Sequence, residues 1–273
     1  MQDTLEVFRR SAISLCQKKG IRKSLMLLCV LAIFSATIYS SSSLHADNND
    51  FMNALYSTLI EQDRYKILLK GFIITFQIAF CSFFLMNILA VLLTFLATRQ
   101  SKVIKNIVSV YTNALSTIPE LTFLFIVFYG FFGDSNISPI IITSIAFAIL
   151  FSPELMLLFV SSIDSVSYGQ IEAARALGFS KIHAFRTIVL PQAIRSGLHG
   201  YMRTLVYAIK VTALTSSVAV ADLAYASQEI QEQTSDTFFP SFIATMFYVA
   251  LIVIVIITFT RIKNLIDYKR RRG

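Results

Sequence analysis

The chain has 273 residues, of which 55% are hydrophobic and only 15% are charged, and its mean hydropathy is +0.67. A surface that faces water needs more charge than this, so the composition excludes a single soluble domain. The formal net charge of +8 would suit a nucleic-acid-binding protein. The basic residues, however, gather in the segments expected on one side of the membrane, which is a signal of topology. No nucleic-acid partner is therefore predicted.

The first 63 residues contain a basic region, an apolar run at 25–44 and a polar segment that we expect outside the membrane. Twenty uncharged residues are enough for a helix to cross about 30 Å of hydrocarbon. The same pattern, with Ala46 as a cleavage site, also fits a signal peptide. We favour a retained anchor; cleavage of residues 1–46 would leave five helices and an external amino terminus.

Five further segments are long and apolar enough to span a membrane. Two carry no charge, and the other three are interrupted by a proline or by charged residues; in order they are 71–98, 107–133, 137–163, 198–221 and 238–260. We therefore predict an all-α integral membrane protein with about six transmembrane helices. A five-helix core over 64–263 follows the extra amino-terminal helix of 1–63, and 264–273 is a basic cytoplasmic tail.

The basic residues fix the expected orientation. With a cytoplasmic amino terminus, nineteen Lys and Arg residues fall on the cytoplasmic side, and the other side holds only Arg64, Lys66 and Lys70. That is the positive-inside pattern, and it places the carboxyl terminus in the cytoplasm. The external side is acidic: Asp47, Asp50, Glu61, Asp63, Asp134, Asp222, Glu229, Glu232 and Asp236.

Cys16, Cys29 and Cys81 lie in or beside apolar segments, without a CxxC motif or a histidine cluster. We expect them to be inert packing residues, and we predict no disulfide framework, metal site or cofactor.

The span 107–133 contains Pro119 at its centre. Proline removes a backbone donor and biases Ile118 away from the helical region, so we expect a break over 116–119. Such breaks are tolerated where they line a cavity or are buried in protein. For Glu120 we favour a simpler interpretation, in which a helix over 121–133 begins here and the carboxylate sits at its positive end.

Glu154, Arg203 and Lys210 lie at membrane depth, where a charge costs several kcal/mol unless it is paired or hydrated. Arg203 is close enough to the cytoplasmic end to reach water. Lys210 fits a structural ion pair or a substrate-facing role equally well. Glu154 follows Pro153, and we expect a partly unwound helix there to give it water or a partner.

Residues 171–193 read IEAARALGFSKIHAFRTIVLPQA and lie between two predicted spans. Apolar residues recur at helical spacing, and Gly178 and Ser180 fit a helix end and a new amino-terminal cap. We predict two short helices with a turn at Gly178, ending at Pro191. A DNA-binding helix-turn-helix has a similar pattern, but the flanking spans favour an amphipathic pair that inserts into the groove of a cytoplasmic partner.

The spacing of this segment resembles the EAA loop of ATP-binding-cassette importer permeases. Glu172-Ala173-Ala174, Gly178 and the run 188–191 match every spaced position of that motif. The flanking pairs Gly169-Gln170 and Gln192-Ala193 are similar to the polar amino-acid branch. The resemblance covers about 64–261 and leaves out residues 1–63.

Three further stretches resemble motifs of that branch. Thr117-Ile118-Pro119 stands in place of Gly-Thr-Pro, Glu154 in place of the Glu of Ala-Tyr-x-x-Glu, and 210–214 in place of Lys-Asp-Thr-Ser-Leu. The Thr-Ala-Leu form of the last stretch is closer to histidine and arginine/ornithine permeases and favours a basic amino acid. Two departures, at 150–153 and at Val211, leave the substrate open.

The resemblance implies a non-catalytic permease subunit of the bacterial inner membrane. Its implied partners are a separate nucleotide-binding ATPase, a second permease subunit that is identical or different, and an extracytoplasmic substrate-binding protein that faces the acidic set 222–236. The implied ATPase-coupling residues are Glu172, Ala173, Ala174, Arg175, Gly178, Leu190 and Pro191. The implied substrate-pathway residues are Thr117, Pro119, Glu154, Lys210 and Thr212.

Glu154 is either a counter-charge for the α-ammonium group of the substrate or the acceptor of a structural hydrogen bond at Pro153. The alternative to an importer is a membrane subunit of an ion channel or of a secondary transporter. The sequence shows no inverted repeat, filter-like glycine run or intramembrane acidic ladder to favour that alternative. A membrane-bound enzyme would need paired carboxylates or clustered histidines, and His45, His183 and His199 are scattered.

Overall fold

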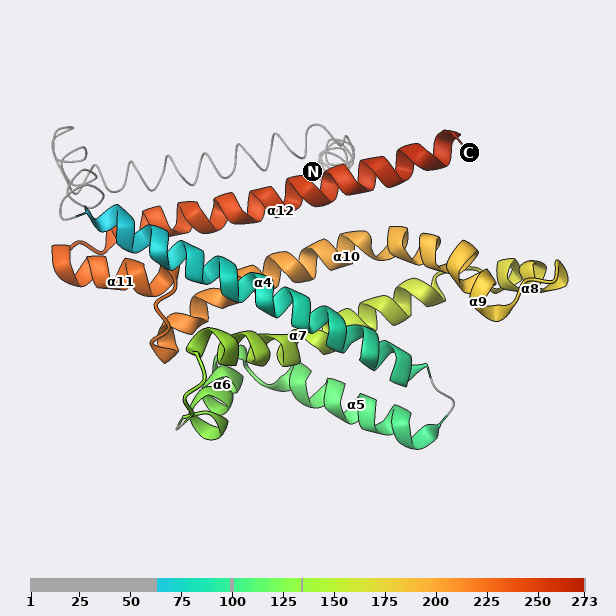
Figure 1. The fold of residues 1–273 in the computed structure, drawn as a ribbon, viewed down its shortest axis with the longest axis horizontal. Helices are drawn as coiled ribbons and strands as arrows, with labels where there is room; N and C mark the ends of the chain where they lie inside the picture. The colour runs from blue at the N-terminus through green and yellow to red at the C-terminus, as the bar shows by residue number, and fades with distance from the viewer. Residues whose placement is uncertain (1–62, 99–100, 134, 273) are drawn as a thin grey trace, which may run out of the picture. The chain divides into compact units, whose positions relative to one another are not determined.

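The computed structural model describes residues 63–98, 101–133 and 135–272, with side chains to residue 266, as helices and turns without a β-strand among them (Figure 1). The predicted amino-terminal helix lies outside the described residues, so the boundary at residue 63 stays a prediction. The elements are α4 Arg64–Ala97, α5 Lys102–Thr117, α6 Glu120–Phe125, the π-helix η2 Ile126–Phe131, α7 Pro139–Asp164, α8 Tyr168–Ala176, α9 Lys181–Ala184, the π-helix η3 Phe185–Val189, α10 Leu190–Val211, the 3₁₀ helix η4 Thr212–Val218, α11 Leu223–Thr234 and α12 Phe238–Arg272.

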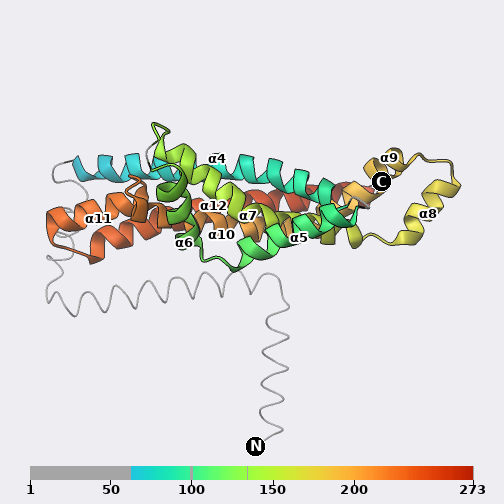
Figure 2. The same ribbon diagram turned by 90° about the horizontal axis from the view of Figure 1, so that it is seen from below.

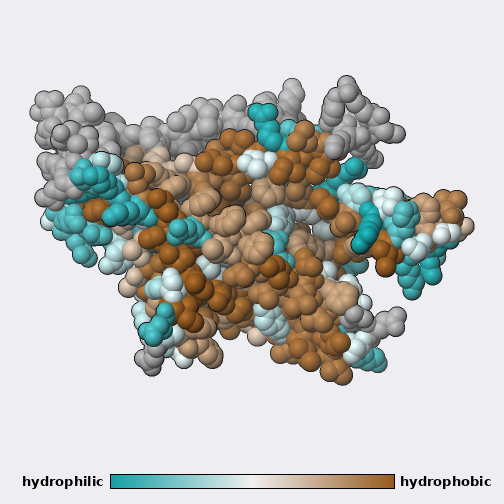
Figure 3. Space-filling model, in the orientation of Figure 1, coloured by the Kyte–Doolittle hydropathy of each residue, from teal (hydrophilic) through white to brown (hydrophobic). Residues whose placement is uncertain are grey.

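Three described helices, α4, α7 and α12, are long and apolar enough to cross a membrane by themselves. Two further candidates are bent pairs: α5 with the α6–η2 segment at 107°, and Lys181–Val218 with α11 at 50°. Counting each pair as one span gives up to five, the number expected for the core. In Figure 3, hydrophilic residues gather at the α11 end and at the α8–α9 end, and hydrophobic residues cover the stretch between them.

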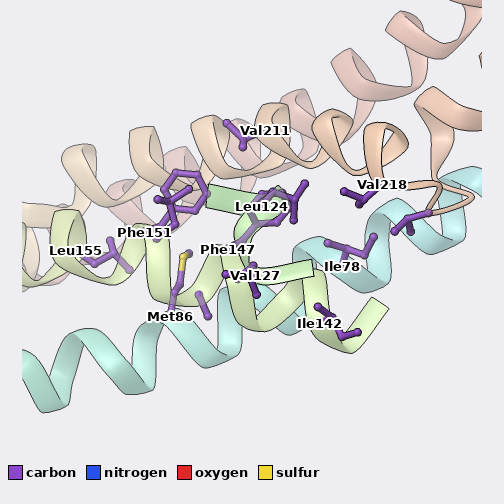
Figure 4. Close-up of a cluster of buried hydrophobic side chains, with 14 of the residues drawn as sticks. Ile78, Met86, Leu124, Val127, Ile142, Phe147, Phe151, Leu155, Val211 and Val218 are labelled. Atoms are coloured by element: carbon purple, nitrogen blue, oxygen red, sulfur yellow. The ribbon is translucent and has the colours of Figure 1, made fainter. Parts of the chain in front are cut away.

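Helix α7 forms the centre of the core. It packs against both α4 and α10, and its most apolar window is far more buried than those of α4 and α12. Figure 4 shows its side chains Phe147, Phe151 and Leu155 among those of the neighbouring helices. Two glycines of α10 let it approach α7 closely. A Cβ atom at Gly197 would lie 2.5 Å from Ser162 Oγ, and one at Gly200 would lie 2.5 Å from Leu158 Cδ1.

The prediction of an unwound helix at Pro153 is wrong, because α7 runs through Pro153 as one helix. Proline lacks the N–H that would bond to the carbonyl of Ile149, four residues earlier. That carbonyl instead accepts from Tyr111 Oη at 3.2 Å and from Ser152 Oγ at 3.0 Å. Hydroxyl groups can replace a missing backbone donor inside a membrane domain, so the helix does not have to open.

The predicted break at Pro119 is confirmed. Helix α5 ends at Thr117, Ile118 is extended with ψ 127°, and Pro119 is the amino-terminal cap of α6. The Thr117 hydroxyl donates to the carbonyls of Asn113 and Ala114, both at 2.9 Å, and so closes the end of α5. Glu120 is the first residue of α6, as the simpler interpretation expected.

The predicted span 198–221 is not one helix. Helix α10 begins at Leu190 and continues as η4 to Val218, and the chain then bends by 50° into α11 at Ala219, which has a left-handed conformation with φ 55°. Asp222 then caps α11 by accepting from the backbone N–H of Tyr225 at 2.8 Å. The carboxylate is 0% exposed, so the expectation that Asp222 belongs to an external surface is wrong.

Helix α4 is tied to this turn on one side and is exposed on the other. Thr75 Oγ1 accepts from the N–H of Leu223 at 3.0 Å, and a Cβ atom at Gly71 would lie 2.7 Å from the carbonyl oxygen of Asp222. Cys81, expected to be packed, is exposed, while Cys16 and Cys29 lie outside the described residues. The exposed apolar side chains of α4 include Leu69, Ile73, Phe76, Phe80, Phe84, Ile88, Val91, Leu92 and Phe95.

Candidate functional site

The helices α8 and α9 project beyond the ends of α7 and α10, at the opposite end of the bundle from α11 (Figures 1 and 2). The predicted pair of short helices with a turn at Gly178 is confirmed. Gly178 has φ +84°, the left-handed conformation that glycine adopts without strain. Ser180 caps α9 by accepting from the N–H of His183 at 3.3 Å, and the His183 ring packs edge-on against Phe179.

We call residues 168–191, from the start of α8 to Pro191, the coupling loop. Ala174, Ala184 and Val189 are buried and give the coupling loop a small core of its own. Glu172 and Arg175 are exposed on the outside of α8, as are Ala173 and Gly178. Large apolar side chains of the coupling loop, Leu177, Ile182 and Phe185, are exposed as well. Exposed apolar side chains among charged ones are expected of helices that dock into a partner's groove.

The second of the two predicted helices does not end at Pro191, contrary to the prediction. Leu190 and Pro191 open α10, and the π-helix η3 comes directly before them. In η3 the N–H of Leu190 donates to the carbonyl of Phe185, five residues earlier. This π-helical turn shifts the backbone hydrogen bonds by one residue directly before Pro191, which has no donor to offer. The helix therefore passes without interruption from the coupling loop into α10.

A second group of polar side chains lies at membrane depth, where α6, α7 and α10 meet. Glu154 of α7 is exposed, and its Oε1 accepts from Thr204 Oγ1 of α10 at 2.9 Å. Glu120 of α6 accepts a hydrogen bond from the Tyr207 hydroxyl of α10. We call Glu120, Glu154, Thr204 and Tyr207 the polar cluster. Neither carboxylate forms an ion pair with another described residue, so both remain available to a cation.

The other candidate pathway residues are placed differently. Lys210 is exposed, three residues beyond Tyr207 on α10, and makes no ion pair with another described residue. Thr117 and Pro119 are exposed at the break between α5 and α6. Thr212 is 1% exposed, and its hydroxyl donates to the carbonyl of Ile209 at 2.7 Å, so this hydroxyl is already used inside the fold.

Sequence reasoning missed Thr204 and Tyr207, although α10 carried a signal for Tyr207. Arg203, Tyr207 and Lys210 are all exposed, and they follow one another at intervals of four and three residues. That spacing puts them on one face of a helix, so the sequence contained a polar stripe within an apolar span. The pairing of Tyr207 with Glu120 could not be anticipated, because 87 residues separate them.

Residues 86–268 match the family described as "Binding-protein-dependent transport system inner membrane component". The match spans most of the described helices, including the coupling loop and the polar cluster. The chain belongs to this family.

Among curated relatives, the chain is 33% identical over 192 residues to the L-cystine transport system permease protein TcyB of Bacillus subtilis, covering 69% of this chain and 81% of that protein. It is 31% identical over 209 residues to the probable glutamine ABC transporter permease protein GlnP of the same organism, covering 74% and 92%. It is 36% identical over 104 residues to the histidine/lysine/arginine/ornithine transport system permease protein HisM of Salmonella typhimurium, covering 38% and 44%.

Solved structures share the fold. An amino acid ABC transporter crystallised with histidines superposes with a TM-score of 0.68 at 24% identity, over 73% of this chain and 94% of that one. The inward-facing MetNI methionine ABC transporter superposes with a TM-score of 0.64 at 18% identity, over 76% and 99%. The described helices therefore have the fold of ABC importer permeases.

Proposed function

We propose that the chain is the permease subunit of an ATP-driven importer of amino acids and that it forms half of the translocation pathway. The observation that carries the proposal is the coupling loop: a rigid, charged pair of helices that runs into α10 in a member of this transport family. Its relatives are permeases for amino acids, which favours the importer over an ion channel or a secondary transporter. ATP would be hydrolysed by a partner subunit and not by this chain.

The coupling residues retain their assigned roles in this proposal. Glu172 and Arg175 make charge contacts in the groove of the ATPase, and Ala174 packs beneath them. Gly178 allows the tight turn, and Leu190 and Pro191 carry the movement into α10. In this proposal the end that carries α8 and α9 is cytoplasmic, as is the carboxyl terminus, because most basic residues belong to that side. Helix α11 lies at the opposite end and faces the binding protein. The exposed or half-exposed acidic residues of the described chain on that side include Glu229, Glu232 and Asp236.

The polar cluster is the substrate contact in this proposal. An amino acid always brings an ammonium group, and Glu154 is exposed at membrane depth without a counter-ion among the described residues. Its bond to Thr204 holds the carboxylate in one orientation. Glu120 is held near the same face of α10 by its hydrogen bond from Tyr207. Two carboxylates at this face favour a substrate with a second positive charge, such as a basic amino acid.

The test begins with gentle purification of the tagged chain from its own membranes. The proposal expects a nucleotide-binding subunit to co-purify and to be lost in the Glu172→Ala/Gly178→Val variant. The same preparation shows whether a second, different permease is present. If no ATPase is recovered under conditions in which a known importer stays intact, the coupling loop must have another partner and the proposal fails.

The substrate is tested with the reconstituted complex and radiolabelled L-arginine, L-histidine, L-glutamine and L-cystine. Glu154→Gln is expected to abolish uptake while leaving folding and basal ATP hydrolysis intact. Uptake at the wild-type rate in Glu154→Gln would contradict the role of Glu154 as a counter-charge for the substrate. Glu154 would then have only the structural role of accepting the bond from Thr204.

A further inference from the structure

A side-chain hydrogen bond closes the coupling loop at its base. Gln170, in the first turn of α8, and Gln192, in the first turn of α10, are 22 residues apart in the chain. Gln192 Nε2 donates to Gln170 Oε1 at 2.6 Å and to the carbonyl of Ile188 at 3.1 Å. Both amide hydrogens are used, so the orientation of the Gln192 side chain is fixed. We call the Gln170–Gln192 bond the clasp.

A second polar link lies next to the clasp, between the end of α7 and α10. Ser165 Oγ donates to Ser196 Oγ at 3.0 Å, and Ser196 Oγ is 3.4 Å from the carbonyl of Ser162. Gly197 gives the close approach at this level, because a Cβ atom there would collide with the Ser162 side chain. The end of α7 and the beginning of α10 are thus joined by hydrogen bonds as well as by packing.

Helix α8 has few other attachments to the membrane helices. Its main neighbours are α9 and η3, which belong to the coupling loop itself. On its amino-terminal side, three residues, Ser165, Val166 and Ser167, connect the end of α7 at Asp164 to the start of α8 at Tyr168. Without the clasp, a push on α8 would be taken up by this short turn. With the clasp, the same push moves the first turn of α10 directly.

We propose that Gln170 and Gln192 are positioning residues for ATPase coupling, and that the clasp makes the coupling loop move as one body with α10. This inference rests on the proposed function. It names the route by which movement at Glu172 reaches the polar cluster, since α10 carries both Thr204 and Tyr207. The clasp acts on transfer of movement and not on docking, so its loss separates ATP hydrolysis from transport.

The test compares Gln170→Leu with Gln170→Glu in the complete complex in proteoliposomes. Leucine has a similar size and cannot accept a hydrogen bond, whereas glutamate keeps the oxygen that Gln192 Nε2 reaches. The measurement is the amount of labelled amino acid, from the panel above, taken up per ATP hydrolysed. Gln170→Leu is expected to lower this ratio by roughly twofold to fivefold, the scale of one hydrogen bond, and Gln170→Glu is expected to retain it.

A double-mutant cycle separates the clasp from a general structural effect. Gln192→Leu should lower the ratio at least as much as Gln170→Leu does, because it also loses the bond to the Ile188 carbonyl. The double variant should be no worse than Gln192→Leu alone, because the clasp is already absent there. Additive losses, or a wild-type ratio in Gln170→Leu, would overturn the inference. The melting temperature and the amount of co-purified ATPase are measured for every variant, to show that it is folded and assembled. If Gln170→Leu unfolds, Gln192→Leu is compared with the wild type in its place.

Different results would contradict the proposed function and the proposed role of the clasp. If the wild-type chain binds no ATPase and takes up none of the panel, the proposed function is wrong. If the wild-type complex transports and Gln170→Leu matches it in uptake per ATP, only the clasp is wrong.

Discussion

The carbonyl of Ile149 gives a sharp test of how α7 stays helical through Pro153. Two hydroxyl groups, from Tyr111 and Ser152, replace the N–H that proline lacks. Tyr111→Phe or Ser152→Ala alone leaves the carbonyl one donor, so each is expected to cost only about 0.5 kcal/mol, as typical for hydrogen bonds in membrane proteins. The double variant leaves a buried acceptor without a partner, which costs roughly 1–3 kcal/mol.

The assay is reversible unfolding of the purified chain in mixed micelles, followed by circular dichroism, for the wild type, both single variants and the double variant. The control adds Pro153→Ala to the double variant, because alanine supplies the missing backbone N–H to Ile149. That triple variant should recover most of the lost free energy of unfolding. Strict additivity of the two single variants, together with no recovery from Pro153→Ala, would refute the account of the helix at Pro153.

Four more outcomes are expected. Gly71→Ala should lower the free energy of unfolding by about 1–3 kcal/mol, because its Cβ would meet the backbone at Asp222. Gly130→Ala is the control and should be neutral, because its Cβ would have no contact closer than 4.0 Å. Thermal melting in detergent compares the two variants. Asp222→Ala removes the cap of α11 and should cost about 0.5–2 kcal/mol in the same assay. Gly178→Asn should keep ATP-coupled uptake and Gly178→Val should lose it, because only asparagine accepts φ +84° readily and the surrounding space is open to both. A water-soluble maleimide should label Tyr207→Cys, made in a Cys81→Ala background, faster than it labels Cys81 in the wild type. Mass spectrometry measures the two labelling rates, and equal rates would contradict a hydrated face on α10.

Local signals in the sequence predicted the features that depend on a few neighbouring residues. Pro119 acts on Ile118 and on its own missing donor, so the break between α5 and α6 could be read directly. Gly178 and Ser180 likewise predicted the turn and the cap within α8 and α9. The apolar lengths predicted the long helices because hydrocarbon thickness sets a minimum length.

Features that depend on distant partners could not be predicted from the sequence. Pro153 suggested an unwound helix, and one of the two hydroxyl groups that let α7 continue belongs to Tyr111, 38 residues before Ile149. Asp222 seemed external because it follows an apolar span, but the bend at Ala219 places it against α4, where it is buried. In both cases the local pattern was read correctly, and a tertiary contact determined the outcome.

The exposed faces of the described helices have two different chemistries, and this difference supports the proposed pathway. Beyond Lys66 and Lys70 near its start, the exposed face of α4 is mostly apolar from Ile73 to Phe95, which suits lipid or another apolar helix. The exposed face of α10 carries Arg203, Tyr207 and Lys210, with Glu154 beside it through Thr204. A lipid-facing surface with these groups would cost several kcal/mol for each charge. The α10 face must therefore meet water, substrate or a polar partner, and the proposed pathway, shared with a second permease subunit, would supply all three.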